Sequence, residues 1–175
     1  STWLGLRGLH DRKTMLEEEV RRDGWLIARE RDLRRDLEAA LTRATTEGVR
    51  WLDQLLTASP NKRPQHAPAL FMRGFLAVLL ADPATARPTL ATAASAARDT
   101  TQPRLLAQAL AMESVAANLA GDHASGHRLL DETRAVVAAL DDLPARLALL
   151  QAEAIDGFTR GDLEVFRSAS AEGAQ

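Results

Sequence analysis

A regular spacing of helix-breaking residues constrains the fold of this chain more than any other feature of its sequence. Short breakers occur at Ala81-Asp82-Pro83, Gly121-Asp122 and Gly161-Asp162, so an Asp recurs at intervals of 40 positions. Each breaker follows one stretch of helical periodicity and precedes another. Gly or Pro ends the first helix, and Asp is a favourable N-cap for the second. Tandem units of this size, each holding two helices, indicate a helical repeat protein.

Two columns of side chains recur with the same period. One column is always Leu and the other is always small, and small residues allow two helices to approach closely. The columns are Leu70, Leu110 and Leu150, and Gly74, Ser114 and Ala154. Phe166 and Ser170 break the columns of the second helices, so the last repeat is expected to be atypical. The pattern predicts helices over 67–81, 84–98, 103–120, 123–140, 143–160 and 162–171.

The N-terminal quarter is less regular. Residues 1–13 are predicted to complete one helix, and Thr14 to Glu17 have the capping-box spacing that opens another. Thr45 to Gly48 are predicted to form a turn into a further helix. The whole chain is expected to form a single helical-repeat domain, with irregular helices over 1–46 and the repeats over 47–175. Because the first residue is Ser, we expect the chain to be processed or to be a piece of a longer protein.

Composition narrows the class of protein. Hydrophobic residues make up 46% of the chain but aromatic residues only 4%, which suits close helix packing better than a β-sandwich. The 22 basic and 24 acidic residues give a net charge of -2, so no global field attracts nucleic acid or an anionic membrane. The longest apolar stretch, 74–81, is shorter than the ~20 residues that span a bilayer. With no signal peptide pattern, a cytoplasmic location is expected.

Residue types that carry catalysis or bind metals are sparse. The absence of Cys excludes disulfides, thiolate nucleophiles and Cys-ligated metals. His123 and His127 have the i, i+4 spacing of metal ligands, but they lack the Glu of a zinc protease motif and a clearly placed third ligand. We therefore favour two metal-free His residues over a metalloenzyme. No phosphate-binding loop or nucleophile elbow occurs, so we predict no catalytic, metal or cofactor site.

Polar residues on the first helix of each repeat are the candidate binding surface. Arg73, Glu113 and Glu153 share one phase of the period and could line a concave face. Alternatively this column faces solvent, or Arg73 pairs with Glu113 across repeats, which would contribute under ~1 kcal/mol. Three further polar residues on the first helices are predicted to join the surface: Gln108, Asn118 and Gln151.

The helix pairs, with Gly-Asp at their turns, resemble tetratricopeptide repeats, although the usual period is ~34 residues. The stretch from Glu47 to Leu56 (EGVRWLDQLL) and the stretch from Ala86 to Leu90 resemble the repeat region of large LuxR-type, ATPase-containing bacterial transcriptional regulators. This resemblance covers residues 47–165. It implies an all-α, tetratricopeptide-like superhelix of antiparallel helix pairs.

The resemblance also implies a non-catalytic sensor and assembly module that has no cofactor. Such a module would bind a partner protein or peptide, a small-molecule inducer, or the regulator's own ATPase domain, and would shift the regulator between two states. Oligomer formation is compatible with this role, whereas direct contact of this segment with nucleic acid or membrane is not expected. The alternative is a stand-alone peptide-binding adaptor or chaperone-like scaffold.

Overall fold

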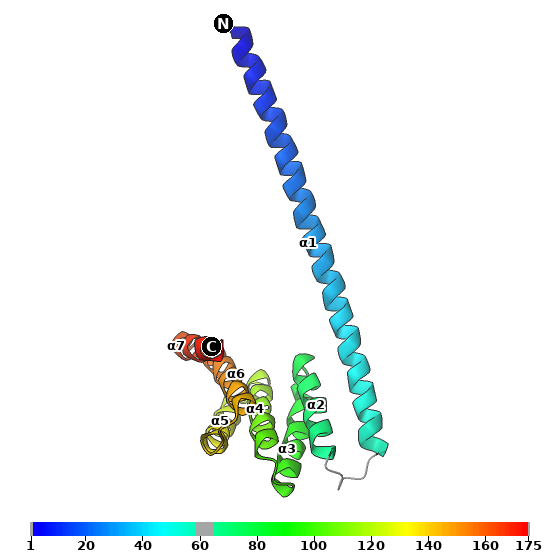
Figure 1. The fold of residues 1–175 in the computed structure, drawn as a ribbon, viewed down its shortest axis with the longest axis vertical. Coiled ribbons are helices and arrows are strands. Elements are labelled where there is room, and N and C mark those ends of the chain that lie inside the picture. The colour runs from blue at the N-terminus through cyan, green and yellow to red at the C-terminus, as the bar shows by residue number, and fades with distance from the viewer. Residues whose placement is uncertain (1, 59–64, 175) are drawn as a thin grey trace. The chain divides into compact units, whose positions relative to one another are not determined.

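The computed structural model of the chain describes residues 2–58 and 65–174, and it consists of helices in those ranges. In the N-terminal helix, the structure does not describe the side chains of residues 2–14, 16, 17, 19, 20, 23, 26 and 27. The all-α fold class is confirmed. The helices, labelled in Figure 1, are α1 (Thr2–Ala58), α2 (His66–Leu79), α3 (Pro83–Asp99), α4 (Pro103–Leu119), α5 (His123–Ala138), α6 (Leu143–Arg160) and α7 (Leu163–Gly173).

The chain divides into two compact units, Ser1–Ala44 and Thr45–Gln175, and the division falls inside α1. The prediction of several N-terminal helices is wrong, because α1 is continuous from Thr2 to Ala58. Neither the predicted helix start at Thr14 nor the predicted turn at 45–48 interrupts it. Gly48 has a packing role instead: a Cβ there would lie 3.2 Å from Leu76 Cδ1 of α2. A single Gly costs a helix only about 1 kcal/mol, which flanking helix-forming residues offset.

The six repeat helices are confirmed, and each end lies within two residues of its predicted position. The predicted Asp caps are also confirmed. The carboxylates of Asp82, Asp122 and Asp162 each accept a hydrogen bond of 3.1 Å from the backbone N–H three residues further on. Asp142 caps α6 in the same way, at 2.9 Å from Ala145 N. These bonds satisfy amides that otherwise lack a partner at a helix N-terminus.

The first helix of each pair ends in a left-handed residue one position before the Asp cap. Ala81, Gly121 and Gly161 have φ of 53°, 77° and 74°. The next amide then bonds back to a carbonyl five residues earlier, for example Asp122 N to Ala117 O at 2.9 Å. This is the Schellman arrangement. The breaker thus ends one helix and caps the next within two residues.

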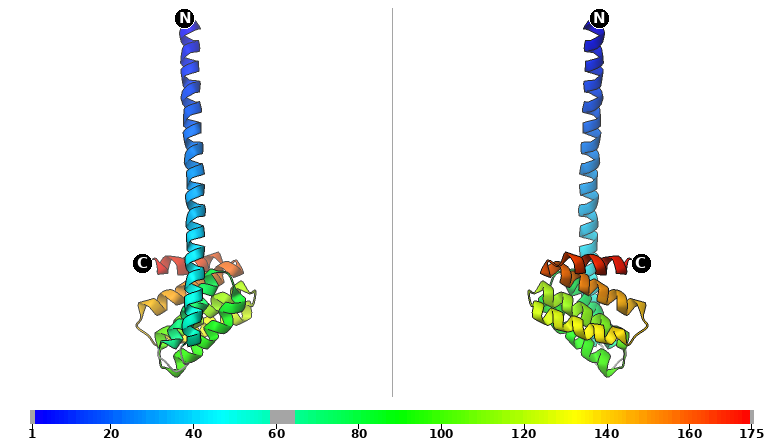
Figure 2. Two further views of the ribbon diagram at one scale, coloured as in Figure 1. Left: turned by 90° about the vertical axis from the view of Figure 1, so that its right-hand side faces the viewer. Right: turned by 90° about the vertical axis from the view of Figure 1, so that its left-hand side faces the viewer.

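The six repeat helices pack in chain order, and the first helices of successive pairs also pack on each other, α2 on α4 and α4 on α6. Figures 1 and 2 show them as antiparallel pairs lying side by side. Helix α4 contacts α2, α3, α5 and α6, and ten of its residues are buried. Leu90, Leu110 and Leu130 are the largest apolar side chains that are fully enclosed. The core therefore lies around α4.

The predicted close approach of helices is confirmed at Gly74 of α2. A Cβ on Gly74 would lie 2.5 Å from Cγ of the fully buried Leu90 of α3. Ser114, at the same phase of the next repeat, is also fully buried. The small residue at this position sets the distance between the paired helices.

The left-handed turns predict opposite effects for reciprocal substitutions. Replacing Gly121 by Ala should destabilise the repeats by about 1 kcal/mol, because an L-residue is strained there while its Cβ would meet no atom within 4 Å. Ala81→Gly should stabilise them by roughly 0.5–1 kcal/mol, since relief of the strain exceeds the added unfolded-state entropy. Urea unfolding followed by circular dichroism measures both. Effects of the same sign would contradict this account.

Gly74→Ala should destabilise the repeats by roughly 1–2 kcal/mol, because overpacking against Leu90 exceeds the gain in helix propensity. Gly24→Ala is the matched control, since Gly24 lies in α1 and a Cβ there meets nothing within 4 Å. Chemical denaturation of the two variants should show a loss only for Gly74→Ala. Equal stabilities would show that α2 and α3 do not meet at this residue.

Candidate binding site

An open cavity of about 360 Å³ lies across the first helices of the three repeats. Helix α4 packs between α2 and α6, so side chains from all three helices reach the same hollow. The lining contains no formally charged residue. It consists of Phe71, Met72, Phe75, Gln108, Met112, Pro144, Leu147, Ala148 and Gln151, and is named here the first-helix groove.

The groove offers aromatic, thioether and aliphatic surface. The rings of Phe71 and Phe75 stack with centroids 6.1 Å apart. Met72 and Leu147 are 43% and 42% exposed, so they can contact a ligand without leaving a packed core. Met side chains adapt to ligands of different shape. The chemistry of the lining therefore suits an apolar, uncharged ligand.

Two predicted site residues, Gln108 of α4 and Gln151 of α6, line this groove. Each amide side chain provides two N–H donors and one carbonyl acceptor. They are the polar side chains of the lining, so they could fix the orientation of a ligand whose contacts are otherwise apolar. Of the six predicted site residues, these two line the groove.

The predicted charged column does not line the groove. Arg73 Nε lies 2.7 Å from Asp53 Oδ1 of α1, so Arg73 pairs with Asp53 rather than with Glu113 of the next repeat. Glu153 of α6 lies 2.7 Å from Arg134 Nε of α5. Arg73 and Glu153 are thus each engaged by a neighbouring helix.

Asn118, the sixth predicted residue, is buried and is 4% exposed, so it does not present its side chain to a partner. Its amide nitrogen donates to Asp156 Oδ1 at 3.3 Å, and its amide oxygen lies 3.2 Å from His123 Nδ1. Asp156 in turn pairs with Arg160 at 2.7 Å. A Cβ on Gly126 would lie 2.5 Å from the Asn118 amide oxygen. Asn118 therefore connects α4, α5 and α6 inside the protein.

The apolar part of the groove was not predicted from the sequence, because the candidate residues were polar ones. A signal was present, since Met72 and Met112 lie 40 positions apart and so share a phase of the repeat. Phe71 and Gln151 likewise share a phase, two repeats apart. Because the residue type at this phase changes from aromatic at Phe71 to amide at Gln151, the two positions are not recognisable as a repeat from the sequence.

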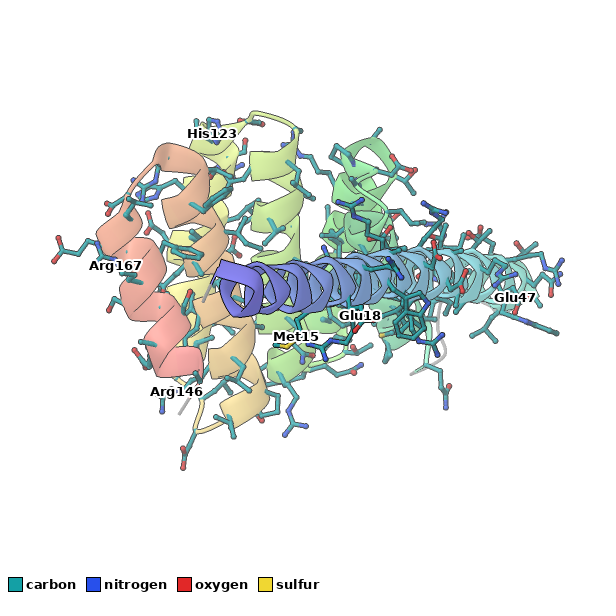
Figure 3. The ribbon with its side chains drawn as sticks, turned by 90° about the horizontal axis from the view of Figure 1, so that it is seen from above. Met15, Glu18, Glu47, His123, Arg146 and Arg167 are labelled. Carbon is teal, nitrogen blue, oxygen red and sulfur yellow. The ribbon has the colours of Figure 1, made fainter. Side chains whose placement is uncertain are left out.

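Other chemistry is limited within the described residues. His123 lies at the start of α5 (Figure 3), and its ring contacts Asn118. Among the side chains that the structure describes, no three His, Asp or Glu gather closely enough to hold a metal ion. No helix among those residues combines the length and apolar character needed to cross a bilayer.

Glu113 of α4 is a half-buried carboxylate whose ionisation is disfavoured. Burial raises the pKa of Glu113 and Glu132 adds to the rise, while Arg87, Arg128 and Arg98 act in the opposite direction. Desolvation is the largest of these effects. Arg87 and Arg98 are themselves paired with Asp122 and Glu132, so they compensate the Glu113 charge only in part.

No family model matches the chain, and neither a curated protein nor a solved structure matches it.

Glu113→Gln should stabilise the repeats at neutral pH. Because the folded pKa of Glu113 lies above its ordinary value, the wild type loses stability as pH rises from the ordinary value through the folded value. The difference in melting temperature between Glu113→Gln and wild type should therefore grow from pH 4 to pH 7. Glu153→Gln is the control, since Glu153 pairs with Arg134 and should show no such gain. A pH-independent difference would contradict the role of burial.

Proposed function

We propose that this chain is a non-catalytic binding module that holds an apolar, uncharged segment of a partner protein in its first-helix groove. One observation carries the proposal: α2, α4 and α6 present a continuous uncharged lining across three successive repeats. The packing of α2 on α4 and of α4 on α6 supports a tetratricopeptide-like superhelix, in which the first helices form the recognition surface.

The size and polarity of the groove favour a peptide segment. Its volume of about 360 Å³ falls near the lower end of the ~300–1,000 Å³ typical of ligand pockets, enough for two or three apolar side chains. Gln108 and Gln151 come from different helices, so their amides can bond successive backbone groups of a peptide. Helical repeats commonly recognise partners through extended surfaces of this kind.

The wider role proposed for the module is the sensor and assembly region of a bacterial transcriptional regulator in the cytoplasm. This step is supported by the resemblance of residues 47–165 to LuxR-type, ATPase-containing regulators. Binding in the groove would favour one arrangement of the helix pairs over another, because a ligand shifts an equilibrium by its differential affinity for the two states. The ligand would come from a partner protein or from the regulator's own ATPase domain.

The three Met residues of the chain provide a direct test. Met72 and Met112 line the groove, whereas Met15 lies on α1 (Figure 3). Peptides selected from a random dodecamer display library on the immobilised protein serve as the probe. In methyl-¹³C-Met NMR spectra, a selected peptide should shift the Met72 and Met112 signals and leave the Met15 signal in place. Selected peptides should carry uncharged apolar cores.

The control uses two Leu residues of α6. Leu147→Glu places a charge in the groove and should weaken peptide binding at least tenfold, because the carboxylate must be desolvated. Leu143→Glu, at a residue that is 66% exposed and outside the lining, should leave binding unchanged. Equal peptide binding by both variants would overturn the peptide proposal. Failure to select any peptide from the library, while a neutral apolar dye binds the groove, would overturn it as well.

A further inference from the structure

Helix α1 has an exposed apolar stripe within the first unit. Leu33 and Leu37 are 59% and 60% exposed, and Ala40 and Ala44 are also exposed. Their spacing of four, three and four residues places all four within about 60° of the helix circumference at 3.6 residues per turn. We name these four residues the α1 stripe.

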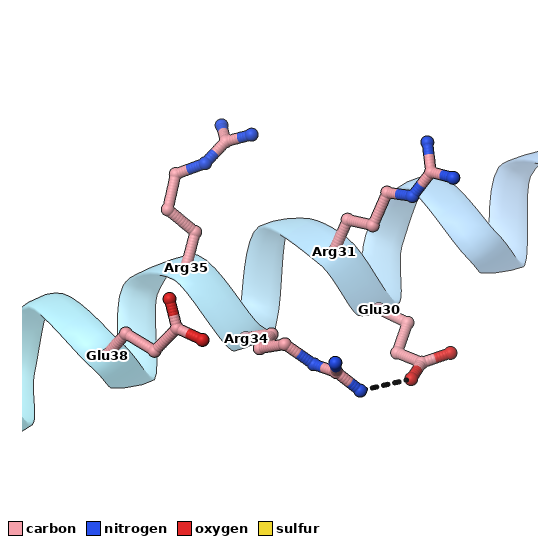
Figure 4. Close-up of a pocket in the computed structure, with 5 residues that line it drawn as sticks. All are labelled: Glu30, Arg31, Arg34, Arg35 and Glu38. Atoms are coloured by element: carbon pink, nitrogen blue, oxygen red, sulfur yellow. Dashed lines mark hydrogen bonds and ion pairs between the residues drawn. The ribbon is translucent and has the colours of Figure 1, made fainter.

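Charged residues flank the α1 stripe on both sides. One flank carries five charged side chains, namely Glu30, Arg31, Arg34, Arg35 and Glu38 (Figure 4). They border a hollow of about 400 Å³ on this helix alone, and Arg34 pairs with Glu30 at 3.3 Å. Because these side chains are solvated on one face of one helix, the hollow is not a ligand site. The other flank carries Asp36 and Arg43, seven residues apart.

Covering the α1 stripe with a partner would lower the free energy, because its apolar side chains would leave water. Residues 1–44 form a unit that contains only part of α1, so no second element of that unit covers the stripe. Burying a Leu side chain contributes about 1.5–3 kcal/mol. Heptad-like apolar stripes of this kind are typical of helices that pair.

We propose that a second copy of this chain covers the α1 stripe, with its α1 running in the antiparallel direction. In the register centred between Glu38 and Ala39, Leu37 faces Ala40 of the second copy and Leu33 faces Ala44 of the second copy. By symmetry each contact occurs twice. Large residues thus lie against small ones along the whole stripe, as close helix packing requires.

Charge complementarity selects the same register. In this register Asp36 of each copy lies beside Arg43 of the other, with an offset of about two residues along the helix axis. Two ion pairs, each joining opposite charges, therefore flank the apolar contacts. Such pairs fix the register and orientation of paired helices more than they add affinity. The flank that carries Asp36 and Arg43 therefore meets opposite charges when the second α1 runs antiparallel in this register.

A parallel pairing fits less well. It would set Leu against Leu and Ala against Ala, and the Ala layers would be held apart by the Leu layers, leaving voids. It would also bring Arg29 of one copy towards Arg34 of the other, which are like charges, and leave Asp36 beside Leu41. Volume and charge both favour the antiparallel arrangement.

Cysteine crosslinking of the full chain tests the register cleanly, because the natural sequence contains no Cys. Ala40→Cys should crosslink to itself with a short bismaleimide, because residue 40 lies close to the symmetry axis. Ala44→Cys alone should not, because the two copies of residue 44 are separated along the axis by 11 residues, about 17 Å. A mixture of Leu33→Cys and Ala44→Cys chains should crosslink to each other.

Every other outcome overturns the proposal. Self-crosslinking of Leu33→Cys and Ala44→Cys, without crosslinking between them, would show a parallel pair. Absence of crosslinks at all positions, with a monomer in sedimentation equilibrium, would show that no second copy covers the stripe. The groove variant Leu147→Glu should leave the crosslinks intact, so failure here is distinct from failure of the peptide proposal.

A charge exchange provides an independent measurement. Asp36→Arg and Arg43→Asp should each weaken the dimer by roughly tenfold, because each places like charges beside each other twice. The double variant should return to the wild-type dissociation constant. Glu38→Arg is the matched control, since it makes the same charge change on the opposite flank and should leave the dimer unchanged. No recovery in the double variant would exclude the register.

Discussion

The burial of α4 determines the rest of the repeat unit. Four helices surround it, and they come close because half of the buried residues of α4 are Ala, with Leu110, Met112 and Val115 as the larger apolar ones. Small side chains bury little area each, so the stability of such a helix depends on contact along nearly its whole circumference. The fully buried Leu90 and Leu130 fill the space on α3 and α5 on either side.

The first-helix groove is a consequence of this packing. Because α2 and α6 both lie against α4, their side chains converge over the partly open part of α4 around Gln108. The polar connection from Asn118 to Asp156 holds α4 against α6 beneath the surface. A buried hydrogen-bonded pair of this kind disfavours sliding of one helix along the other, since sliding would leave both groups unpaired. The lining residues are therefore positioned by contacts that no ligand touches.

What the sequence could reveal depended on the range of the interactions involved. The ends of the repeat helices were predictable because their Asp caps and left-handed turns act over five residues or fewer. Of the predicted site residues, Gln108 and Gln151 lie in the groove, whereas Arg73 and Glu153 form ion pairs with positions about 20 residues away, which leave no local trace in the sequence. Gly48 misled for the same reason: its partner is Leu76, and nothing near it in sequence distinguishes a packing Gly from a turn Gly.

The two units differ in how their apolar residues are covered, and under the proposed pairing this difference would make the state of α1 depend on protein concentration. The repeats bury Leu90, Leu110 and Leu130 within one chain, so their stability is independent of how many chains are present. In the proposed pairing Leu33 and Leu37 are buried by a second chain, and the stabilisation that this gives increases with protein concentration by mass action. In proteins, most of the stability of a helix comes from packing of its apolar face rather than from helix propensity. Dilution should therefore lower the helicity of α1 before it affects the repeats, so pairing of two chains would control the order of the helix that leads into the repeats.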